Sequence, residues 1–261
     1  MATSSITHNF VVSNPNSVKR FVAAIDEADR DRTPKQTLPG RQLTNPQEIL
    51  ALMSKGRKNM SDKYFTVNIR AYLDKDEPTY IGEESLYDLL SDFSCPKNPD
   101  VEYFLLHNAI EFTKKDQSIT YLVFDAEDAS LVGYFSLTVK PISVRASNIS
   151  KTMAKKLSRV SILDEETQSY TTAAYLIAQL GKNYSLPKEK RIPGNILLGF
   201  ALETISSLKY SVGGVMEFLE CEDNEFLLSF YTQNHFKPFD TRITASQNNE
   251  PHTLHQLLKF I

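Results

Sequence analysis

Residues 188–202 read KEKRIPGNILLGFAL, a basic loop that ends at a glycine and runs directly into an apolar stretch of helical character. Lys188, Lys190 and Arg191 supply positive charge, and Gly194 has no Cβ to keep a ligand away from the backbone. The first backbone N–H groups of a helix have no partner within it, and they lie at its positive end. The segment therefore predicts a binding site for a phosphate-bearing ligand at Gly194.

The segments on either side of this loop predict a sheet edge with a tyrosine close to it. Residues 173–180 form an apolar run typical of a buried strand, and residues 215–220 form a second one after the helix. Residues 224–234 then have helical character and contain Tyr231. Ligands in open α/β sheets bind at the carboxyl ends of the strands. We therefore expect the phosphate site and a phenolic proton donor at the same edge of the sheet.

The composition is that of a globular protein without a strongly charged surface. The chain has 261 residues, of which 41% are hydrophobic, and its formal net charge is -3, so no overall basic field indicates nucleic acid. Its two cysteines favour a reducing compartment over a disulfide scaffold. No apolar run approaches the ~20 residues needed to span a bilayer, and no secretory signal precedes the first predicted element. We expect a cytoplasmic protein.

The first 59 residues differ from the rest of the chain. They contain two short amphipathic helical patterns, at residues 18–29 and 46–53, joined by a polar linker with prolines and a glycine. A new pattern begins at Met60-Ser61-Asp62, which is typical of the start of an independent protein. The sequence predicts a small helical appendage at residues 1–59 and a main domain at residues 60–261.

The main domain alternates strand and helix patterns. Apolar runs predict strands at residues 65–69, 118–125, 131–139, 173–180 and 215–220, and a final strand or short helix at residues 254–261. Helical spacing predicts helices at residues 85–93, 98–112, 194–208 and 224–234, while residues 149–160 form a basic helix or loop. This order predicts an α/β (α+β) fold with a mixed central sheet and flanking helices.

The segments around Gly194 and Tyr231 resemble those of the GNAT superfamily of acyl-CoA N-acyltransferases. The acetyl-CoA motif of that family is (Gln/Arg)-x-x-Gly-x-(Gly/Ala). Residues 191–196, RIPGNI, match its first two fixed positions and depart from it at Ile196. Residues 228–236, LSFYTQNHF, resemble the family's FYxxxGF segment, with His235 in place of the usual glycine. The resemblance extends over residues 64–261 and is best from 131 to 238.

The resemblance implies a GNAT-like sheet, acetyl-CoA as co-substrate and transfer of an acetyl group to an amine. A backbone N–H near Leu180 would hold the thioester carbonyl oxygen. Tyr231 would protonate the leaving thiolate, since its reference pKa of about 10 is close to that of a thiol. Glu220 and Glu222 are candidate bases, acting directly or through water. The cofactor-binding residues implied in this way are Leu180, Arg191, Ile192, Pro193, Gly194, Asn195 and Ile196.

Residues 132–137, VGYFSL, are similar to a strand of the GNAT toxins of toxin–antitoxin modules, which acetylate the amino group of aminoacyl-tRNA. This looser resemblance implies a toxin-like enzyme, with residues 1–59 as an antitoxin-like segment that packs in cis or across a homodimer and restrains it. Several cations within a few helical turns are candidate contacts for tRNA phosphates: Lys151, Lys155, Lys156 and Arg159. A solvated helix face explains the same cluster equally well.

Other interpretations stay open at this point. The acceptor could be a small amine or a protein amino group, or the domain could be a non-catalytic module that binds acyl-CoA. Residues 1–59 could merely cover an apolar patch. Tyr231 could be a core aromatic residue, and Cys221 is more typical of a small buried hydrophobic residue than of a nucleophile. His107 and His235 lack metal-ligand spacing, so we expect no metal.

Overall fold

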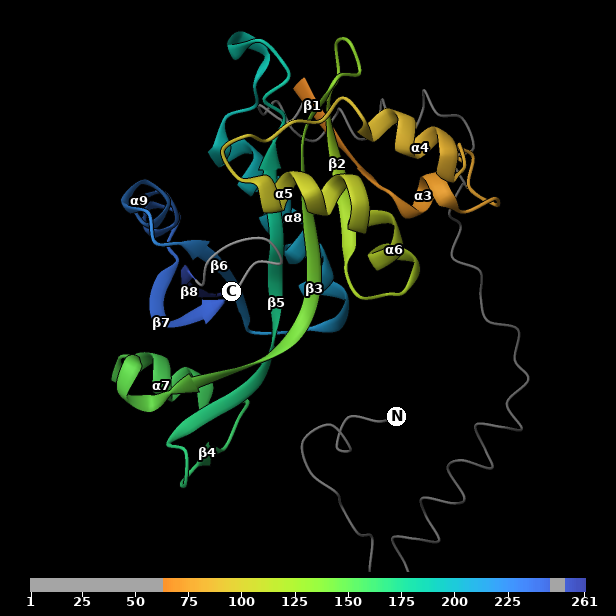
Figure 1. Ribbon diagram of the computed structural model, residues 1–261. Coiled ribbons are helices and arrows are strands. Elements are labelled where there is room, and N and C mark those ends of the chain that lie inside the picture. The colour runs from red at the N-terminus through yellow and green to blue at the C-terminus, as the bar shows by residue number, and fades with distance from the viewer. Residues whose placement is uncertain (1–62, 245–251) are drawn as a thin grey trace, which may run out of the picture. The chain divides into compact units, whose positions relative to one another are not determined.

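The computed structural model describes residues 63–244 and 252–261 (Figure 1). The predictions for residues 1–59, including the two amphipathic helices and the boundary with the main domain, lie outside these described residues and stay predictions. Within the described ranges, no helix is both long and apolar enough to cross a bilayer.

A mixed sheet of eight strands forms the centre of the described part of the chain. Its strands follow the order β1-β2-β3-β5-β6-β8-β7, and β4 pairs only with β5. Neighbouring strands are antiparallel except for β5 and β6, which run parallel. The strands span Tyr64–Asn68 (β1), Ile119–Asp125 (β2), Leu131–Arg145 (β3), Leu163–Asp164 (β4), Ser169–Lys182 (β5), Met216–Glu222 (β6), Lys237–Thr244 (β7) and His252–Phe260 (β8).

Helices of different lengths connect the strands. They span Arg70–Leu73 (α3), Glu83–Leu90 (α4), Pro99–Tyr103 (α5), Ala109–Lys114 (α6), Lys151–Leu157 (α7), Gly194–Val212 (α8) and Glu225–Gln233 (α9). A π-helix at Phe104–Asn108 joins α5 to α6, and 3₁₀ turns lie at Ala146–Asn148 and Lys188–Lys190.

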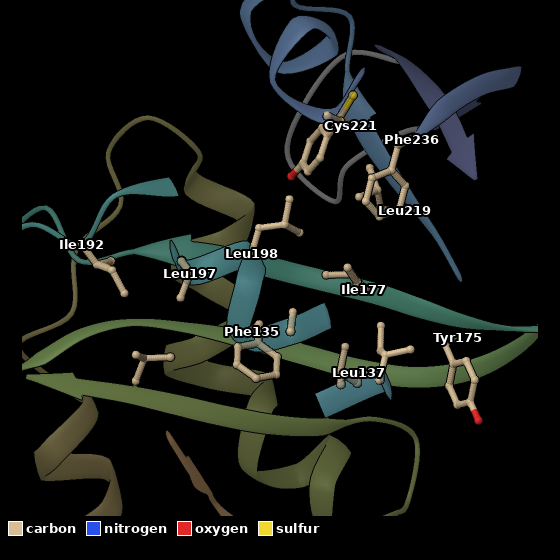
Figure 2. Packing of buried hydrophobic residues seen from close by; sticks show 14 of the residues in the cluster. Phe135, Leu137, Tyr175, Ile177, Ile192, Leu197, Leu198, Leu219, Cys221 and Phe236 are labelled. Atoms are coloured by element: carbon tan, nitrogen blue, oxygen red, sulfur yellow. The ribbon is translucent and has the colours of Figure 1, made fainter. Parts of the chain in front are cut away.

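Side chains on the two faces of the sheet belong to different apolar clusters. In β3, Phe135 packs in the cluster under α8 and α9, whereas its neighbour Tyr134 packs in the cluster under α4, α5 and α6. In β8, Leu257 belongs to the α8 cluster, and Leu258 belongs to a third cluster beside α7. This alternation is expected of strands that are covered on both faces. Figure 2 shows the α8 cluster, in which side chains from β3, β5, β6 and α8 meet.

The prediction of a mixed sheet with flanking helices is confirmed, and most of the predicted elements are present. Three features differ from the predictions. Strand β3 extends to Arg145 and pairs with β5 from Ser169 onward, so the two strands form a long arm that carries α7 and β4. The helix predicted at residues 98–112 is interrupted by the π-helix, and β7 has no counterpart in the predictions.

Local chemistry explains two of these differences. The hydroxyl of Tyr134 donates to the carbonyl oxygen of Val101 at 2.6 Å, just before the π-helix, and a side chain that uses a helical carbonyl disturbs the regular helical ladder. Strand β7 has Pro238 at its second position and three charged residues, and it lies at the edge of the sheet. Prolines and charges are typical of edge strands, so the apolar pattern that would predict a strand is weak there.

Candidate active site

Strands β5 and β6 are paired over only a short stretch. Their parallel register covers three residue pairs and ends at Ile177 and Leu219. A bulge in β5 follows at once, where its register with β3 shifts by one residue. Beyond the bulge, residues 179–182 of β5 pair with β3 on one edge and with no described strand on the other. We call this open edge, together with residues 220–222 of β6, the strand split.

At the strand split, the backbone N–H and C=O groups on the β6 side of β5 have no strand partner among the described residues. Figure 2 shows Leu219 and Cys221 on a strand that diverges from the one carrying Ile177, with Leu198 of α8 pointing toward the space between them. Leu180, which we expect beside a thioester carbonyl, lies in the open stretch and is half-buried against the α8 cluster. Because N–H and C=O groups on an open strand edge need partners, this place suits an extended ligand.

The start of α8 lies at the end of the loop that follows β5. Pro193 is the N-cap residue, and the first turn of the helix contains no acidic side chain. Within the described part of the chain, the N–H groups of Ile192, Gly194 and Asn195 have no hydrogen-bond acceptor. Unpartnered N–H groups at the positive end of a 19-residue helix attract an anion.

The glycine at position 194 is not required by the protein's own packing. An added Cβ would lie 3.4 Å from the ring of Phe230 and 3.5 Å from Cε of Lys182, which are ordinary contact distances. Its backbone is also outside the left-handed region that favours glycine. The space in front of Gly194 is therefore available to a ligand. Ile196, where the GNAT motif has a small residue, packs instead against the α8 cluster.

The positive charge near this helix start comes from Lys182, Lys97 and Arg191. Of these, Lys182 has no hydrogen-bond or ion-pair partner within the described residues. Lys182, the last residue of β5, is half-buried, and this burial, with repulsion from Lys97 and Arg191, lowers its pKa. Lys97 and Arg191 both lie over the ring of Tyr184, at 5.3 and 5.1 Å from its centroid. A bound anion would relieve the mutual repulsion of these groups.

The basic side chains of the loop itself are less available than the sequence suggested. Lys190 forms an ion pair with Asp128 at 2.6 Å. Arg191 donates to the carbonyl oxygens of Leu186 at 2.8 Å and Tyr184 at 3.1 Å, so its guanidinium helps to shape the loop. The positive charge that faces Gly194 therefore includes Lys182, which sequence reasoning missed.

Tyr231 comes from α9, which begins and ends with well-formed caps. The side chain of Asn224 accepts from the N–H of Phe226 at 2.9 Å at the start. At the end, the N–H of Phe236 bonds to the carbonyl of Tyr231 at 3.1 Å and the N–H of His235 to that of Thr232 at 3.0 Å. This is the Schellman arrangement, and it is completed by the edge-to-face contact between the rings of Tyr231 and Phe236 at 6.1 Å.

The Schellman arrangement explains why the family's glycine position matters. His235 occupies the residue after the helix cap with φ of 71°, in the left-handed region. Glycine adopts this conformation without strain, whereas a residue with a Cβ does not. The chain keeps the turn despite the substitution, so the ring of Tyr231 keeps its position.

The environment of Tyr231 suits a proton donor. The side chain is 9% exposed, and among the described residues its hydroxyl makes no hydrogen bond. Burial, with a smaller contribution from Cys221, raises the pKa of Tyr231 well above its ordinary value. The phenol therefore carries its proton throughout the physiological pH range.

The neighbouring residues of β6 have distinct roles. Burial, with the charges of Glu222 and Asp223, raises the pKa of the Cys221 thiol to about 11, so this thiol stays protonated and is not a nucleophile. The carboxylate of Glu220 accepts a hydrogen bond from Arg242 at 2.5 Å and another from Gln256 at 2.7 Å, so both of its oxygens have partners. Only one of the two candidate bases is therefore free of a cationic partner.

Glu222 is that remaining candidate base. Its carboxylate accepts from the Asn98 side-chain amide at 3.0 Å, and the other end of this amide caps α5 by accepting from the N–H of Val101 at 3.1 Å. Asn98 thus joins the helical layer over β3 to the end of β6. The sequence offered no signal for Asn98 or Lys97, because only the fold brings them to this edge.

The predicted tRNA-contact residues lie in a different part of the fold. All four are in or just after α7, on the arm formed by β3 and β5. Lys156 lies 5.1 Å over the ring of Phe260 and lines a cavity, whereas Lys151, Lys155 and Arg159 are exposed elsewhere on α7 and the turn after it. In the described ranges, no three His, Cys, Asp or Glu side chains are grouped in a way that could hold a metal.

No protein-family model matches the sequence, and no curated protein matches it either. Solved structures do match. A tyrosine-to-phenylalanine variant of KacT is 16% identical, covers 76% of this chain and 95% of its own, and has a TM-score of 0.51. A tyrosine-to-phenylalanine variant of the toxin AtaT is 17% identical, with 78% and 93% covered and a TM-score of 0.50. AtaT complexed with acetyl-methionyl-tRNAfMet is 18% identical, with 74% and 93% covered and a TM-score of 0.49. The chain therefore has a GNAT-like fold that is structurally similar to the toxins AtaT and KacT.

Proposed function

We propose that this protein is an acetyl-CoA-dependent N-acetyltransferase that works at the strand split. One observation supports the proposal: unpartnered N–H groups at the start of α8, an open edge of β5 and Tyr231 belong to segments that pack in the same apolar cluster beside the carboxyl ends of β5 and β6. A pyrophosphate, a thioester and a leaving thiolate need these three kinds of group. The GNAT-like fold supports the same reading.

The residues of this chain would each have a defined role in the reaction. The N–H groups of Ile192, Gly194 and Asn195 bind the pyrophosphate, with Lys182 adding charge. The open edge of β5 at Leu180 orients the thioester carbonyl. As the C–N bond forms and the C–S bond breaks, Tyr231 gives its proton to the thiolate, and the amine loses one proton to a base.

Glu222 is the base that the geometry supports. Its carboxylate lies at the end of β6 beside Cys221, and within the described ranges it accepts one hydrogen bond, from the amide of Asn98 at 3.0 Å. An α-amino group has a reference pKa of about 8, so part of it is already unprotonated near neutral pH and needs little help. An α-amino acceptor therefore fits this site better than a lysine side chain, whose reference pKa is about 10.4.

The acceptor that we propose is the amino group of aminoacyl-tRNA. AtaT has been solved with acetyl-methionyl-tRNAfMet, which makes aminoacyl-tRNA the first acceptor to assay. The full chain is incubated with labelled acetyl-CoA and aminoacyl-tRNA, with and without nuclease. Label that becomes nuclease-sensitive supports this acceptor, and label on small amines or on protein supports the alternative acceptors. A chain that binds acetyl-CoA and transfers nothing to any of them is a non-catalytic module.

Gly194 provides the sharpest test of cofactor binding. Gly194→Ala adds a methyl group that the protein accommodates but that a bound pyrophosphate does not, so acetyl-CoA affinity should fall about tenfold, or about 1.4 kcal/mol. Gly199→Ala is the matched control, because it lies on the same helix and its Cβ would meet nothing within 4 Å. Calorimetry on both variants measures the difference. Equal affinities would remove the loop from the cofactor site.

We also propose that residues 1–59 restrain the enzyme. A tethered segment has an effective concentration of about 1 mM, so even a weak inhibitory contact is occupied. A protease site inserted after residue 59 allows the segment to be released from the folded full chain. The acetylation rate at low protein concentration should rise after cleavage. An unchanged rate would leave the segment with no inhibitory role.

A further inference from the structure

A basic hollow lies away from the strand split, between α7, the turn from α9 to β7 and the end of β8. Figure 1 shows α7 beside the β7–β8 hairpin. The hollow has a volume of about 420 Å³. We call it the basic notch, and it is lined by Ser150, Thr152, Met153, Lys156, His235, Lys237, Leu258, Lys259 and Phe260.

The basic notch carries a net positive charge. Its lining contains three lysines and one histidine but no carboxylate. Within the described residues, Lys156 and Lys237 have no ion-pair partner, whereas Lys259 lies 3.0 Å from the carboxylate of Glu217. Glu217 is 1% exposed and does not line the notch, so its carboxylate offsets the charge of one lysine and leaves the other two. Charge of one sign that gathers in a concave site attracts an anion even though the whole chain has a net charge of -3.

Two of the three lysines of the basic notch contact aromatic rings. The ammonium group of Lys156 lies 5.1 Å from the centroid of Phe260, and that of Lys259 lies 5.3 Å from the centroid of Phe236. Both contacts are within cation–π range, which limits the rotamers that these long side chains adopt. The cationic groups are therefore positioned before a ligand arrives, and less entropy is lost on binding.

The lining also contains apolar side chains. Met153, Leu258 and Phe260 contribute side chains from α7 and β8 to the same hollow. An apolar floor with a partly buried aromatic ring can take a nucleobase, while the lysines bind a phosphate. A volume of about 420 Å³ falls in the range of sites for small organic ligands. A simple inorganic anion would leave the apolar part of the notch unused.

We propose that the basic notch binds a nucleoside phosphate, either as a free nucleotide or as one unit of an RNA strand. The proposal does not rest on the acetyltransferase reaction. None of the lining residues belongs to the open edge of β5, to the loop before α8 or to the Tyr231 position. Of the four cations that the sequence singled out on and after α7, only Lys156 takes part, and its partners come from the last quarter of the chain.

Two probes distinguish the two sources of the nucleotide. A short single-stranded RNA with a 5′ fluorescent label is titrated with the full chain by anisotropy, and AMP is titrated by calorimetry. Binding of both indicates a site for a free nucleotide that also accepts RNA, and binding of RNA alone indicates a unit within a strand. If neither probe binds at millimolar concentration, the proposal is overturned.

Paired variants locate the binding. Lys156→Ala with Lys237→Ala should weaken binding to the RNA at least about tenfold and reduce the slope of log K against log salt by about 1.4, because each phosphate contact with a single strand contributes about 0.7. Lys75→Ala with Lys140→Ala removes the same charge from exposed positions outside the notch and should change binding less than twofold. Melting temperatures equal to that of the parent show that the variants fold. Equal losses in the two double variants would mean that only general surface charge is involved, and would overturn the proposal.

Discussion

The two edges of strand β5 have opposite properties. On one edge β5 pairs with β3 through thirteen residue pairs, from Gly133–Lys182 to Arg145–Ser169. On the other edge it pairs with β6 through three. The same strand therefore acts as the backbone of the sheet on one side and as the wall of a candidate site on the other. The residues of the candidate site lie where the pairing of β5 with β6 stops, because only there are backbone groups without strand partners and room for a ligand.

The edge of β5 that pairs with β3, which we call the closed edge, depends on close packing. An added Cβ at Gly133 would lie 2.7 Å from the carbonyl oxygen of Gly181, so the two glycines let β3 and β5 approach under α8 and α5. The open edge depends on α8 and α9 instead. Cys221 is 6% exposed there although its strand has left β5, because helix side chains fill the place of a strand partner. The open edge therefore has no strand partner, but apolar side chains of the helices still cover it.

The largest effect should come from the open edge. Tyr231→Phe removes the proposed acid and keeps the ring, so kcat should fall by about 10² to 10⁴-fold. Acetyl-CoA affinity should stay within about twofold, since the hydroxyl makes no hydrogen bond among the described residues that the change would remove. Single-turnover transfer assays and calorimetry measure the two quantities.

A matched variant guards this result against a packing effect. Phe230→Leu alters the neighbouring ring, which contacts Tyr231 edge-to-face at 5.1 Å, but leaves the hydroxyl in place. It should reduce kcat far less than Tyr231→Phe. If both variants slowed transfer equally, the ring packing rather than the hydroxyl would carry the effect.

Exclusion of water from Cys221 at the open edge should also change how the free energy of unfolding depends on pH. The pKa of Cys221 rises from 9.0 to about 11 on folding, so the folded state binds its proton more tightly. Its contribution is fully present below pH 9 and is lost as pH rises toward 11, by about 2 to 3 kcal/mol in total. Urea unfolding from pH 8 to pH 11 measures this slope, and Cys221→Ala should flatten it. A profile for Cys221→Ala parallel to that of the parent would show that the thiol is hydrated.

The closed edge should respond through stability rather than rate. In Gly181→Ala the new Cβ would lie 2.6 Å from Cγ1 of Val101 and 2.7 Å from Cε1 of Tyr134. The Tyr134 ring is fully buried and its hydroxyl is tied to Val101, so neither can move easily. We expect a loss of about 1 to 3 kcal/mol in the free energy of unfolding.

The matched change on a solvent-facing helix has the opposite sign. Gly199→Ala should raise the free energy of unfolding by about 0.5 to 1 kcal/mol, because alanine favours a helix and the site is open. Chemical denaturation of both variants makes the comparison. A neutral effect of Gly181→Ala would mean that the closed edge is not tightly packed.

Much of the open edge was predictable from the sequence, because its parts are local. The loop before Gly194, the helix after it and the helix that carries Tyr231 are each contiguous, and their patterns are strong. The sheet class followed from the order of elements. The position of Leu180 at an unpaired edge depends on a bulge, and sequence patterns carry little signal for a single-residue register shift.

The cations and amides around the site were harder to predict, because they come from distant segments. Lys97 and Asn98 precede α5, which packs over the sheet, and only the fold brings them near Tyr184 and Glu222. Lys182 had a usable signal, since it follows the predicted strand at residues 173–180 directly and precedes the basic loop. The arm of β3 and β5 was underestimated because Lys140 and Pro141 interrupt the apolar run of β3, and the residues beyond them are buried only at every second position.

The smallest effect concerns the turn that holds Tyr231 against the open edge. His235→Gly removes the strain of a Cβ at φ of 71° and should raise the free energy of unfolding by about 0.5 to 1 kcal/mol, the gain being offset in part by the freer unfolded chain. His235→Ala is the matched control, because it also removes the imidazole but keeps the Cβ. Thermal and urea unfolding of the two variants should therefore differ, with alanine close to the parent. If alanine stabilised the protein as much as glycine, the imidazole and not the backbone would be the source of strain, and the Schellman turn would hold Tyr231 equally well with any residue at this position.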